Sequence, residues 1–187
     1  MQKRRELMAQ TNEPLLSVKG LKQYFPVSKK FTVRAVDNIS FDIYPGETYG
    51  LVGESGSGKS TTGRSIIRLY DPTEGTILFN GEDISKKLTA KQEKMLRSDM
   101  QMVFQDPMAS LNPHKKILDT IAMGLDAHHP HMDQKERVER VSKMMEMVGL
   151  NPAYMNRYPN QFSGGQRQRI GLGRALIMNP KLVIADE

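Results

Sequence analysis

The sequence contains no cysteine and no apolar run long enough to cross a membrane. Without cysteine, disulfides, zinc fingers and cysteine nucleophiles are excluded, and a reducing cytosol is the natural compartment. A spanning helix needs about 18 consecutive apolar residues, and the polar first twelve residues hold no apolar signal segment either. If this protein works at a membrane, we expect it to sit there through a partner.

The net charge of +6 at pH 7 could suit nucleic acid, anionic lipid or nucleotide. The basic residues are scattered along the sequence rather than massed on one segment, which favours an ordinary solvated surface. Hydrophobic residues make up 38% of the 187 residues, enough for one globular domain with a core, with or without a small appended subdomain.

The first half of the chain alternates strand and helix patterns. Residues 15–21 are apolar enough for a strand, and residues 39–43 alternate apolar and polar side chains as a half-buried strand does. Residues 48–52 are apolar on both faces, which predicts a buried parallel strand. A helix is expected over residues 60–69 and a returning strand over 75–79. This order predicts an α/β fold.

Helical spacing takes over from residue 117 to about residue 149. A capping-box pattern that begins at Asp133 predicts the start of its second helix. The methionines of that helix, Met144, Met145 and Met147, could form a docking surface, but a place in the core is favoured. We therefore expect a helical insert.

The pattern G-x-x-x-x-G-K-S follows the predicted strand at 48–52 and opens the predicted helix. Its glycines let backbone N–H groups turn inward on phosphates, and the helix N-terminus adds the positive end of its dipole. Lys59 would reach the β and γ phosphates, and the Ser60 hydroxyl would ligate Mg²⁺. A dinucleotide-binding G-x-G-x-x-G does not fit, because the third glycine is missing after Gly56 and Gly58. The pattern predicts a phosphate-binding loop, with a glycine turn that only caps a helix as the alternative.

An apolar run at residues 182–185 ends in Asp186 and Glu187. A P-loop NTPase presents a carboxylate in this way at the C-terminal edge of its sheet. Asp186 would hold Mg²⁺ through water, and Glu187 would polarise the attacking water as a general base. Alone, these residues could be any strand end; downstream of a phosphate-binding loop they indicate a catalytic edge.

The segment Phe162-Ser163-Gly164-Gly165-Gln166 resembles the signature motif of ABC ATPases. Two glycines and a serine at a helix N-terminus can approach an ATP closely and donate to its γ phosphate. In ABC ATPases that ATP is held by the P-loop of the facing subunit. The resemblance therefore implies two composite sites in a head-to-tail dimer.

Three further segments look like the ATPase subunits of oligopeptide and dipeptide importers, and the similarity covers the chain from about Leu15 to Glu187. They are Gln105-Asp106-Pro107, Ser110-Leu111-Asn112-Pro113 and Arg157-Tyr158-Pro159. Relatives in this group also serve nickel and opine-like solutes, so the cargo stays open. The two ATPase subunits are commonly different proteins there, so a homodimer and a heterodimer both stay open.

The resemblance also implies roles for single residues. Gln105 corresponds to the glutamine that contacts Mg²⁺ and the water, beside the metal candidates Ser60 and Asp186. Glu187, Gln105 and Lys59 are the catalytic candidates. Phe25, or its neighbour Tyr24, matches the aromatic that stacks on adenine. The nucleotide-binding set is Phe25, Tyr24, Gly53, Glu54, Ser55, Gly56, Ser57, Gly58, Lys59, Ser60, Thr61, Ser163, Gly164, Gly165 and Gln166.

The implied fold is α/β: a P-loop NTPase (RecA-like) ABC ATPase core with an N-terminal antiparallel β subdomain and a helical subdomain, the C-terminal part of the core missing. Its expected parts are residues 13–114 with the β subdomain and P-loop core, 115–165 as the helical subdomain with the signature motif, and 166–187 returning to the core.

The implied function is an ATPase motor, using ATP and Mg²⁺, that energises import of peptides or related small solutes at the cytoplasmic face of the cell membrane. Expected partners are a second ABC ATPase subunit, transmembrane permease subunits and, indirectly, an extracytoplasmic solute-binding protein, with no nucleic acid. The alternatives are a soluble ABC ATPase acting on nucleic acid or the ribosome, and a non-hydrolytic nucleotide-binding module.

The sequence departs from the family pattern at its end and in one helix. ABC ATPases continue into a strand that carries a switch histidine and lies between the P-loop strand and the Asp-Glu strand. We therefore expect a fragment with unpaired apolar strand edges that binds nucleotide weakly or folds poorly. Gly171 and Gly173 stand where the family helix carries better helix formers, at a cost of about 1 kcal/mol each.

Overall fold

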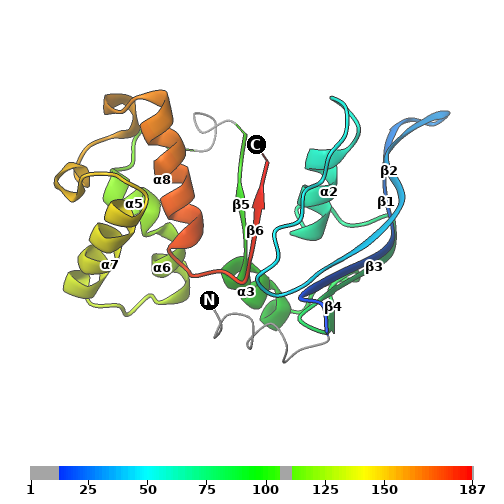
Figure 1. The fold of residues 1–187 in the computed structure, drawn as a ribbon, viewed down its shortest axis with the longest axis horizontal. Coiled ribbons are helices and arrows are strands. Elements are labelled where there is room, and N and C mark those ends of the chain that lie inside the picture. The colour runs from blue at the N-terminus through cyan, green and yellow to red at the C-terminus, as the bar shows by residue number, and fades with distance from the viewer. Residues whose placement is uncertain (1–12, 106–110, 187) are drawn as a thin grey trace. The chain divides into compact units, whose positions relative to one another are not determined.

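A computed structural model of the protein describes residues 13–105 and 111–186. They form two compact units that divide between Glu93 and Lys94. Each unit has a sheet of its own (Figure 1). In the described part of the chain, no helix is long and apolar enough to span a bilayer. The three parts predicted at residues 13–114, 115–165 and 166–187 are subdomains of a single domain. Their boundaries stay a prediction.

The first unit is a four-stranded antiparallel sheet with one helix. Its elements are β1 (Leu16–Ser28), β2 (Phe31–Ile43), α2 (Lys59–Ile66), β3 (Glu74–Phe79) and β4 (Glu82–Asp83). The strand order is β2-β1-β3-β4. Leu16 and Val18 of β1 are buried and lie opposite Phe79 and Ile77 of β3. These alternate apolar residues face one side of the sheet, which explains why the segment folds as a strand.

The strands predicted at 15–21, 39–43 and 75–79 are confirmed, and the first two extend into a long hairpin. The helix predicted at 60–69 is confirmed as α2 but ends at Ile66. The cause is Arg68, whose φ of 60° lies in the left-handed region that cannot continue a helix.

The parallel strand predicted at residues 48–52 is wrong for the described chain. Neither of its two sheets includes this segment. A strand exists through backbone pairing with a neighbour, and no described segment pairs with residues 48–52. Its side chains are accordingly exposed, Leu51 by 43% and Val52 by 93%.

The second unit combines a two-stranded parallel sheet with a helical cluster. The chain passes from the first unit to the second within α3 (Ala90–Asp99). The strands are β5 (Met100–Val103) and β6 (Leu182–Ala185), paired from Met100↔Leu182 to Val103↔Ala185. The helices are α5 (Ile117–Ile121), α6 (Met123–His128), α7 (Gln134–Met147), the 3₁₀ turns η1 (Pro152–Tyr154) and η2 (Pro159–Gln161), and α8 (Gly164–Leu176).

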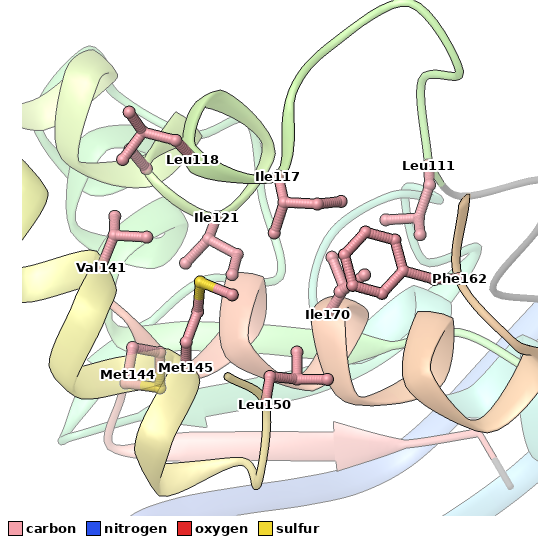
Figure 2. Packing of buried hydrophobic residues seen from close by; sticks show 11 residues of the cluster. Leu111, Ile117, Leu118, Ile121, Val141, Met144, Met145, Leu150, Phe162 and Ile170 are labelled. Carbon is pink, nitrogen blue, oxygen red and sulfur yellow. The ribbon is translucent and has the colours of Figure 1, made fainter. Parts of the chain in front are cut away.

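The helical cluster has a core of its own (Figure 2). The predicted helix start at Asp133 is confirmed, because its carboxylate accepts hydrogen bonds from the backbone of Lys135 and Glu136. Met144 and Met145 are buried as predicted, whereas Met147 is 73% exposed, so the core interpretation is wrong for that residue. The core residues are Leu111, Ile117, Leu118, Ile121, Ala122, Val141, Met144, Met145, Leu150, Phe162 and Ile170.

A charge cluster joins three of these helices. The guanidinium of Arg137 in α7 donates to Asp126 of α6 at 2.7 Å and to Asp119 of α5 at 3.0 Å. The hydrogen bond to Asp126, followed by the bond to Asp119, raises the pKa of Arg137 above its ordinary value. Because the Arg137 side chain is only 12% exposed, removing either carboxylate would leave a largely desolvated cation.

The glycines of α8 have room for a methyl group. A Cβ built at Gly171 meets no atom within 4 Å, and one at Gly173 reaches ordinary contact with Met144 at 3.4 Å. By contrast, a Cβ at Gly124 in α6 would lie 2.8 Å from Cγ of Met178. The predicted helix cost of the two α8 glycines is therefore not offset by any packing need.

Replacing Gly171 by alanine should raise the free energy of unfolding by about 1 kcal/mol, because alanine loses less backbone entropy in a helix. The matched variant Gly124→Ala should gain less, since Met178 must move first. Urea denaturation followed by circular dichroism measures both. A loss of stability in Gly171→Ala would contradict the open space at that position.

Candidate functional site

The glycine-rich loop before α2 has the backbone that a phosphate-binding loop needs. Gly56 and Gly58 have φ values of 80° and 92°, in the left-handed region that favours glycine. Gly58 is the N-cap of α2, and no side chain caps this helix end. The N-terminal N–H groups of α2 are thus left without a capping side chain, which is the condition for an anion-binding helix start.

Lys59 is the first residue of α2, and its side chain turns back onto the loop that precedes the helix. Its ammonium group donates to the carbonyl oxygens of Gly53 and Glu54, at 2.8 Å each. The loop is closed further by the N–H of Ser57, which donates to the carbonyl of Glu54 at 3.1 Å. A cation held inside a ring of backbone is placed where phosphate oxygens of a bound nucleotide would need it.

At two glycines of the loop, an added Cβ would come too close to a neighbouring atom. A Cβ at Gly58 would overlap the carbonyl oxygen of Ala35 in β2, and one at Gly53 would lie 2.5 Å from the hydroxyl of Ser57. The role of Ala35 could not be predicted from the sequence, because a backbone contact between residues 23 positions apart leaves no signal in the residue type. The loop is therefore pressed against β2.

The two candidate aromatics lie in different surroundings. The Tyr24 hydroxyl donates to the carboxylate of Asp37 at 2.5 Å, and the Arg34 guanidinium lies 5.4 Å from the ring centroid. The hydrogen bond to Asp37 raises the pKa of Tyr24. Phe25 meets the ring of Tyr70 in a T-shaped contact, with centroids 5.2 Å apart. Both rings belong to β1, and the choice between them stays open.

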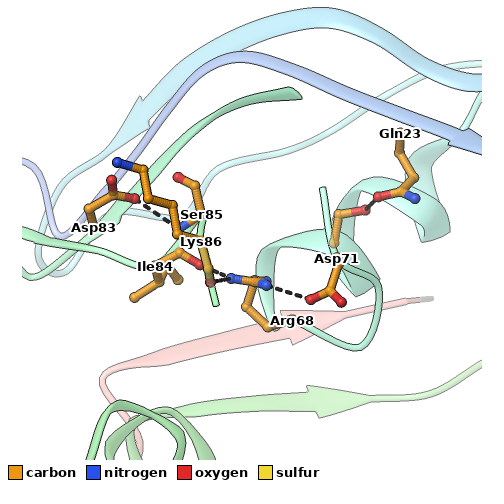
Figure 3. Close-up of polar contacts among 8 residues, drawn as sticks. Gln23, Arg68, Asp71, Asp83, Ile84, Ser85 and Lys86 are labelled. Carbon is orange, nitrogen blue, oxygen red and sulfur yellow. Dashed lines mark hydrogen bonds and ion pairs between the residues drawn. The ribbon is translucent and has the colours of Figure 1, made fainter. Parts of the chain in front are cut away.

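The C-terminal end of α2 is held against the rest of the first unit by polar contacts of two buried side chains, Ser65 and Arg68 (Figure 3). The Ser65 hydroxyl in α2 donates to the side-chain oxygen of Gln23 in β1 at 3.1 Å. The guanidinium of Arg68, buried beyond the helix, donates to the backbone carbonyls of Ile84 and Lys86 and to the carboxylate of Asp71. These bonds hold the helix that carries the loop at its N-terminus.

The signature segment of the second unit begins α8 with a reciprocal capping box. The Ser163 hydroxyl accepts from the backbone N–H of Gln166 at 3.3 Å, and the Gln166 side chain accepts from the N–H of Ser163 at 2.9 Å. Gly164 and Gly165 are exposed, and an added Cβ at either would meet no atom within 4 Å. The predicted helix start is confirmed, and its glycines leave the first turn open to a close approach.

The parallel pair β5–β6 brings Gln105 and Asp186 to the same sheet edge. Val103 and Ala185 are paired, and the N–H of Asp186 donates to the carbonyl of Val103 at 2.9 Å. Gln105 follows two residues after Val103, at the carboxyl end where parallel strands place ligand-binding groups. Glu187 lies outside the described residues.

A groove of about 520 Å³ lies between α8 and these two strands. Gln105, Gly165 and Arg174 are among its lining residues. Burial lowers the pKa of Arg174 below its ordinary value. No cluster of three or more His, Cys, Asp or Glu side chains that could bind a metal forms within residues 13–105 and 111–186.

The residues from position 36 to position 187 match the model of a protein family described as "ABC transporter". The chain is 58% identical over 175 residues to the oligopeptide transport ATP-binding protein OppF of Bacillus subtilis (strain 168), covering 94% of this chain and 57% of that protein. It is 50% identical over 187 residues to the oligopeptide transport ATP-binding protein AppF of the same organism, with coverages of 97% and 56%.

The fold is similar to that of the ATP-binding cassette MJ0796, solved as a dimer in a post-hydrolysis state bound to ADP and Pi. The TM-score is 0.83 at 30% identity, covering 91% of this chain and 72% of that one. The chain spans just over half the length of the curated relatives it matches.

The contact between Gly58 and β2 predicts a difference between two glycine variants. Gly56→Ala should lower the free energy of unfolding by about 1–2 kcal/mol, the cost of a positive φ. Gly58→Ala should lose about 1–3 kcal/mol more, because its Cβ also collides with Ala35. Urea denaturation measures both. Equal losses would contradict the close approach of the two backbones.

Proposed function

Because the chain belongs to the ABC transporter family, we propose that it is the ATP-binding subunit of an importer for oligopeptides or related small solutes. The oligopeptide transport proteins to which it is similar support this cargo class, and a nickel or opine-like cargo remains the alternative. The likeness to a solved ATP-binding cassette confirms the predicted fold class, an α/β P-loop cassette with an antiparallel β subdomain.

The observation that carries the proposal is the backbone of the glycine-rich loop. Its two left-handed glycines, its uncapped helix start and the ammonium of Lys59 within the loop all fit a polyphosphate. The space that a Cβ at Gly53 or Gly58 would fill must stay empty for the backbone to close in this way. ATP therefore fits the residues that are present.

Each residue has a proposed role. Lys59 binds the β and γ phosphates, and the adenine stacks on Phe25 or Tyr24. Ser60, Gln105 and Asp186 would hold Mg²⁺, which supplies charge neutralisation on the phosphate oxygens. Few protein ligands suffice, because Mg²⁺ keeps several waters and also binds substrate phosphates. Glu187 orients the attacking water and accepts its proton.

The signature segment supports a two-subunit site. The capped start of α8 offers exposed glycines and the hydroxyl of Ser163 to a phosphate. We assign these groups to the ATP of a second ABC ATPase subunit, either a second copy or a different protein. The dimeric state of the cassette MJ0796 supports that arrangement.

The remaining partners follow from the importer role. Transmembrane permease subunits would hold the chain at the cytoplasmic face of the membrane, and an extracytoplasmic solute-binding protein would deliver the cargo. A soluble ABC ATPase acting on nucleic acid is the second candidate. Co-purification of the tagged protein with membrane subunits supports the first; recovery with ribosomes or nucleic acid alone would favour the second.

Removing the Lys59 ammonium should weaken Mg-ATP binding by about 10- to 100-fold, the worth of a charge-assisted hydrogen bond. Isothermal titration of Lys59→Ala against the parent chain measures this. Lys91→Ala, which removes an exposed lysine from α3, is the matched control and should bind as the parent does. Equal affinity in the parent and Lys59→Ala would remove the basis of the proposal.

Lys59→Ala and a second variant, Glu187→Gln, test turnover. Steady-state Mg-ATP hydrolysis should vanish in Lys59→Ala, and Glu187→Gln should bind ATP yet hydrolyse it at least about 100-fold more slowly, as expected for loss of a general base. Activity that survives both substitutions would point to a contaminating ATPase. Full activity in Glu187→Gln alone would refute its role as the base.

A further inference from the structure

The β1–β2 hairpin extends beyond the rest of its sheet (Figure 1). β3 pairs with β1 only from Leu16 to Lys22, whereas β2 follows β1 as far as the pair Ser28↔Phe31. From Gln23 onward the hairpin is therefore a two-stranded ribbon. We call residues 26–33 the ribbon tip.

Three apolar side chains at the ribbon tip are exposed. Val27 is 65% exposed, Phe31 59% and Val33 39%. Phe31 and Val33 are two residues apart on β2, so their side chains share a face of the ribbon. Phe25 of β1 is paired with Val33. Exposed apolar side chains that lie together on one surface are typical of an interaction site.

The same tip is positively charged. Between Glu13 and Asp37 the sequence has five lysine or arginine residues and no acidic residue. Lys22 pairs with Glu74 and Arg34 lies 3.8 Å from Asp37. Lys29 and Lys30, in the turn, are exposed and form no salt bridge within the described chain.

We propose that the ribbon tip is a contact for an anionic lipid surface, with Phe31 and Val27 entering the headgroup region and Lys29 and Lys30 meeting lipid phosphates. An interfacial anchor combines these two kinds of side chain. The inference rests on the proposed function only in so far as that function keeps the chain beside a membrane.

Other occupants fit the tip less well. Nucleic acid would account for the lysines and could stack a base on Phe31, but it would leave the exposed aliphatic side chains of Val27 and Val33 without an apolar partner. A second copy of the chain would bring two further lysines against Lys29 and Lys30, and like charges repel. A lipid surface satisfies both the apolar and the cationic groups.

The first test uses the absence of tryptophan from the sequence. Phe31→Trp supplies a single reporter at the tip, and Tyr44→Trp supplies one at another exposed position of the same unit. With phosphatidylglycerol-containing vesicles, the emission of Phe31→Trp should shift to shorter wavelength and be quenched by brominated lipid. Tyr44→Trp should show neither effect. No shift at position 31, or equal shifts at both positions, would overturn the proposal.

The second test measures the lysines. Two lysines at an anionic surface are worth about a 30-fold gain in partitioning, so Lys29→Gln with Lys30→Gln should lose about that factor in vesicle flotation. The matched double variant Lys86→Gln with Lys87→Gln removes another exposed pair from the same unit and should lose no more than about 3-fold. Equal losses in the two double variants would overturn the proposal.

Further measurements distinguish lipid binding at the tip from the other candidate occupants and from the proposed nucleotide binding. Lys59→Ala should bind vesicles as the parent does, even if nucleotide binding fails. A Phe31→Trp shift produced without vesicles by ATP, by single-stranded nucleic acid or by raising the protein concentration would assign the tip to that occupant instead. Binding to neutral phosphatidylcholine vesicles as strong as to anionic ones would also refute the assigned charge contact.

Discussion

The close approach of Gly58 to the carbonyl of Ala35 is the constraint on which the first unit depends. It presses the glycine-rich loop against β2 and fixes where α2 begins. At its other end the helix is held by the hydrogen bond from the Ser65 hydroxyl to the Gln23 side chain. The buried guanidinium of Arg68 adds hydrogen bonds to backbone carbonyls just beyond the helix. A helix fixed at both ends can present its N-terminal N–H groups to an anion without reorganising, which is what binding a polyphosphate requires.

In the second unit, side chains hold the start of a helix in place, where the first unit uses a backbone contact. Ser163 and Gln166 cap α8 reciprocally, so the helix start is ordered although its two glycines are exposed. The strand pair β5–β6 places Gln105 and Asp186 at one edge through ordinary parallel register. Each unit thus carries part of the predicted nucleotide machinery.

Both units bury apolar side chains and also leave some exposed, Met147 of the second unit among them. The helical cluster buries eleven hydrophobic residues in one core. The first unit leaves Leu51 and Val52 of the expected central strand, and Val27 and Phe31 of the ribbon, in contact with solvent. Residues 48–52 are an unpaired apolar segment, where pairing with another strand would add stability.

The sequence by itself determined the motifs whose chemistry is local. The glycine spacing of the loop, the helix start at Ser163 and the apolar run before Asp186 depend on neighbouring residues, so they could be predicted and their backbone settings are confirmed. The strand prediction for residues 48–52 is wrong, because apolar composition indicates burial but does not provide a strand with which to pair. Only the tertiary structure decided that Ala35 lies against Gly58 and that the ribbon tip is exposed. Those facts depend on contacts between distant segments, which residue type and spacing do not encode.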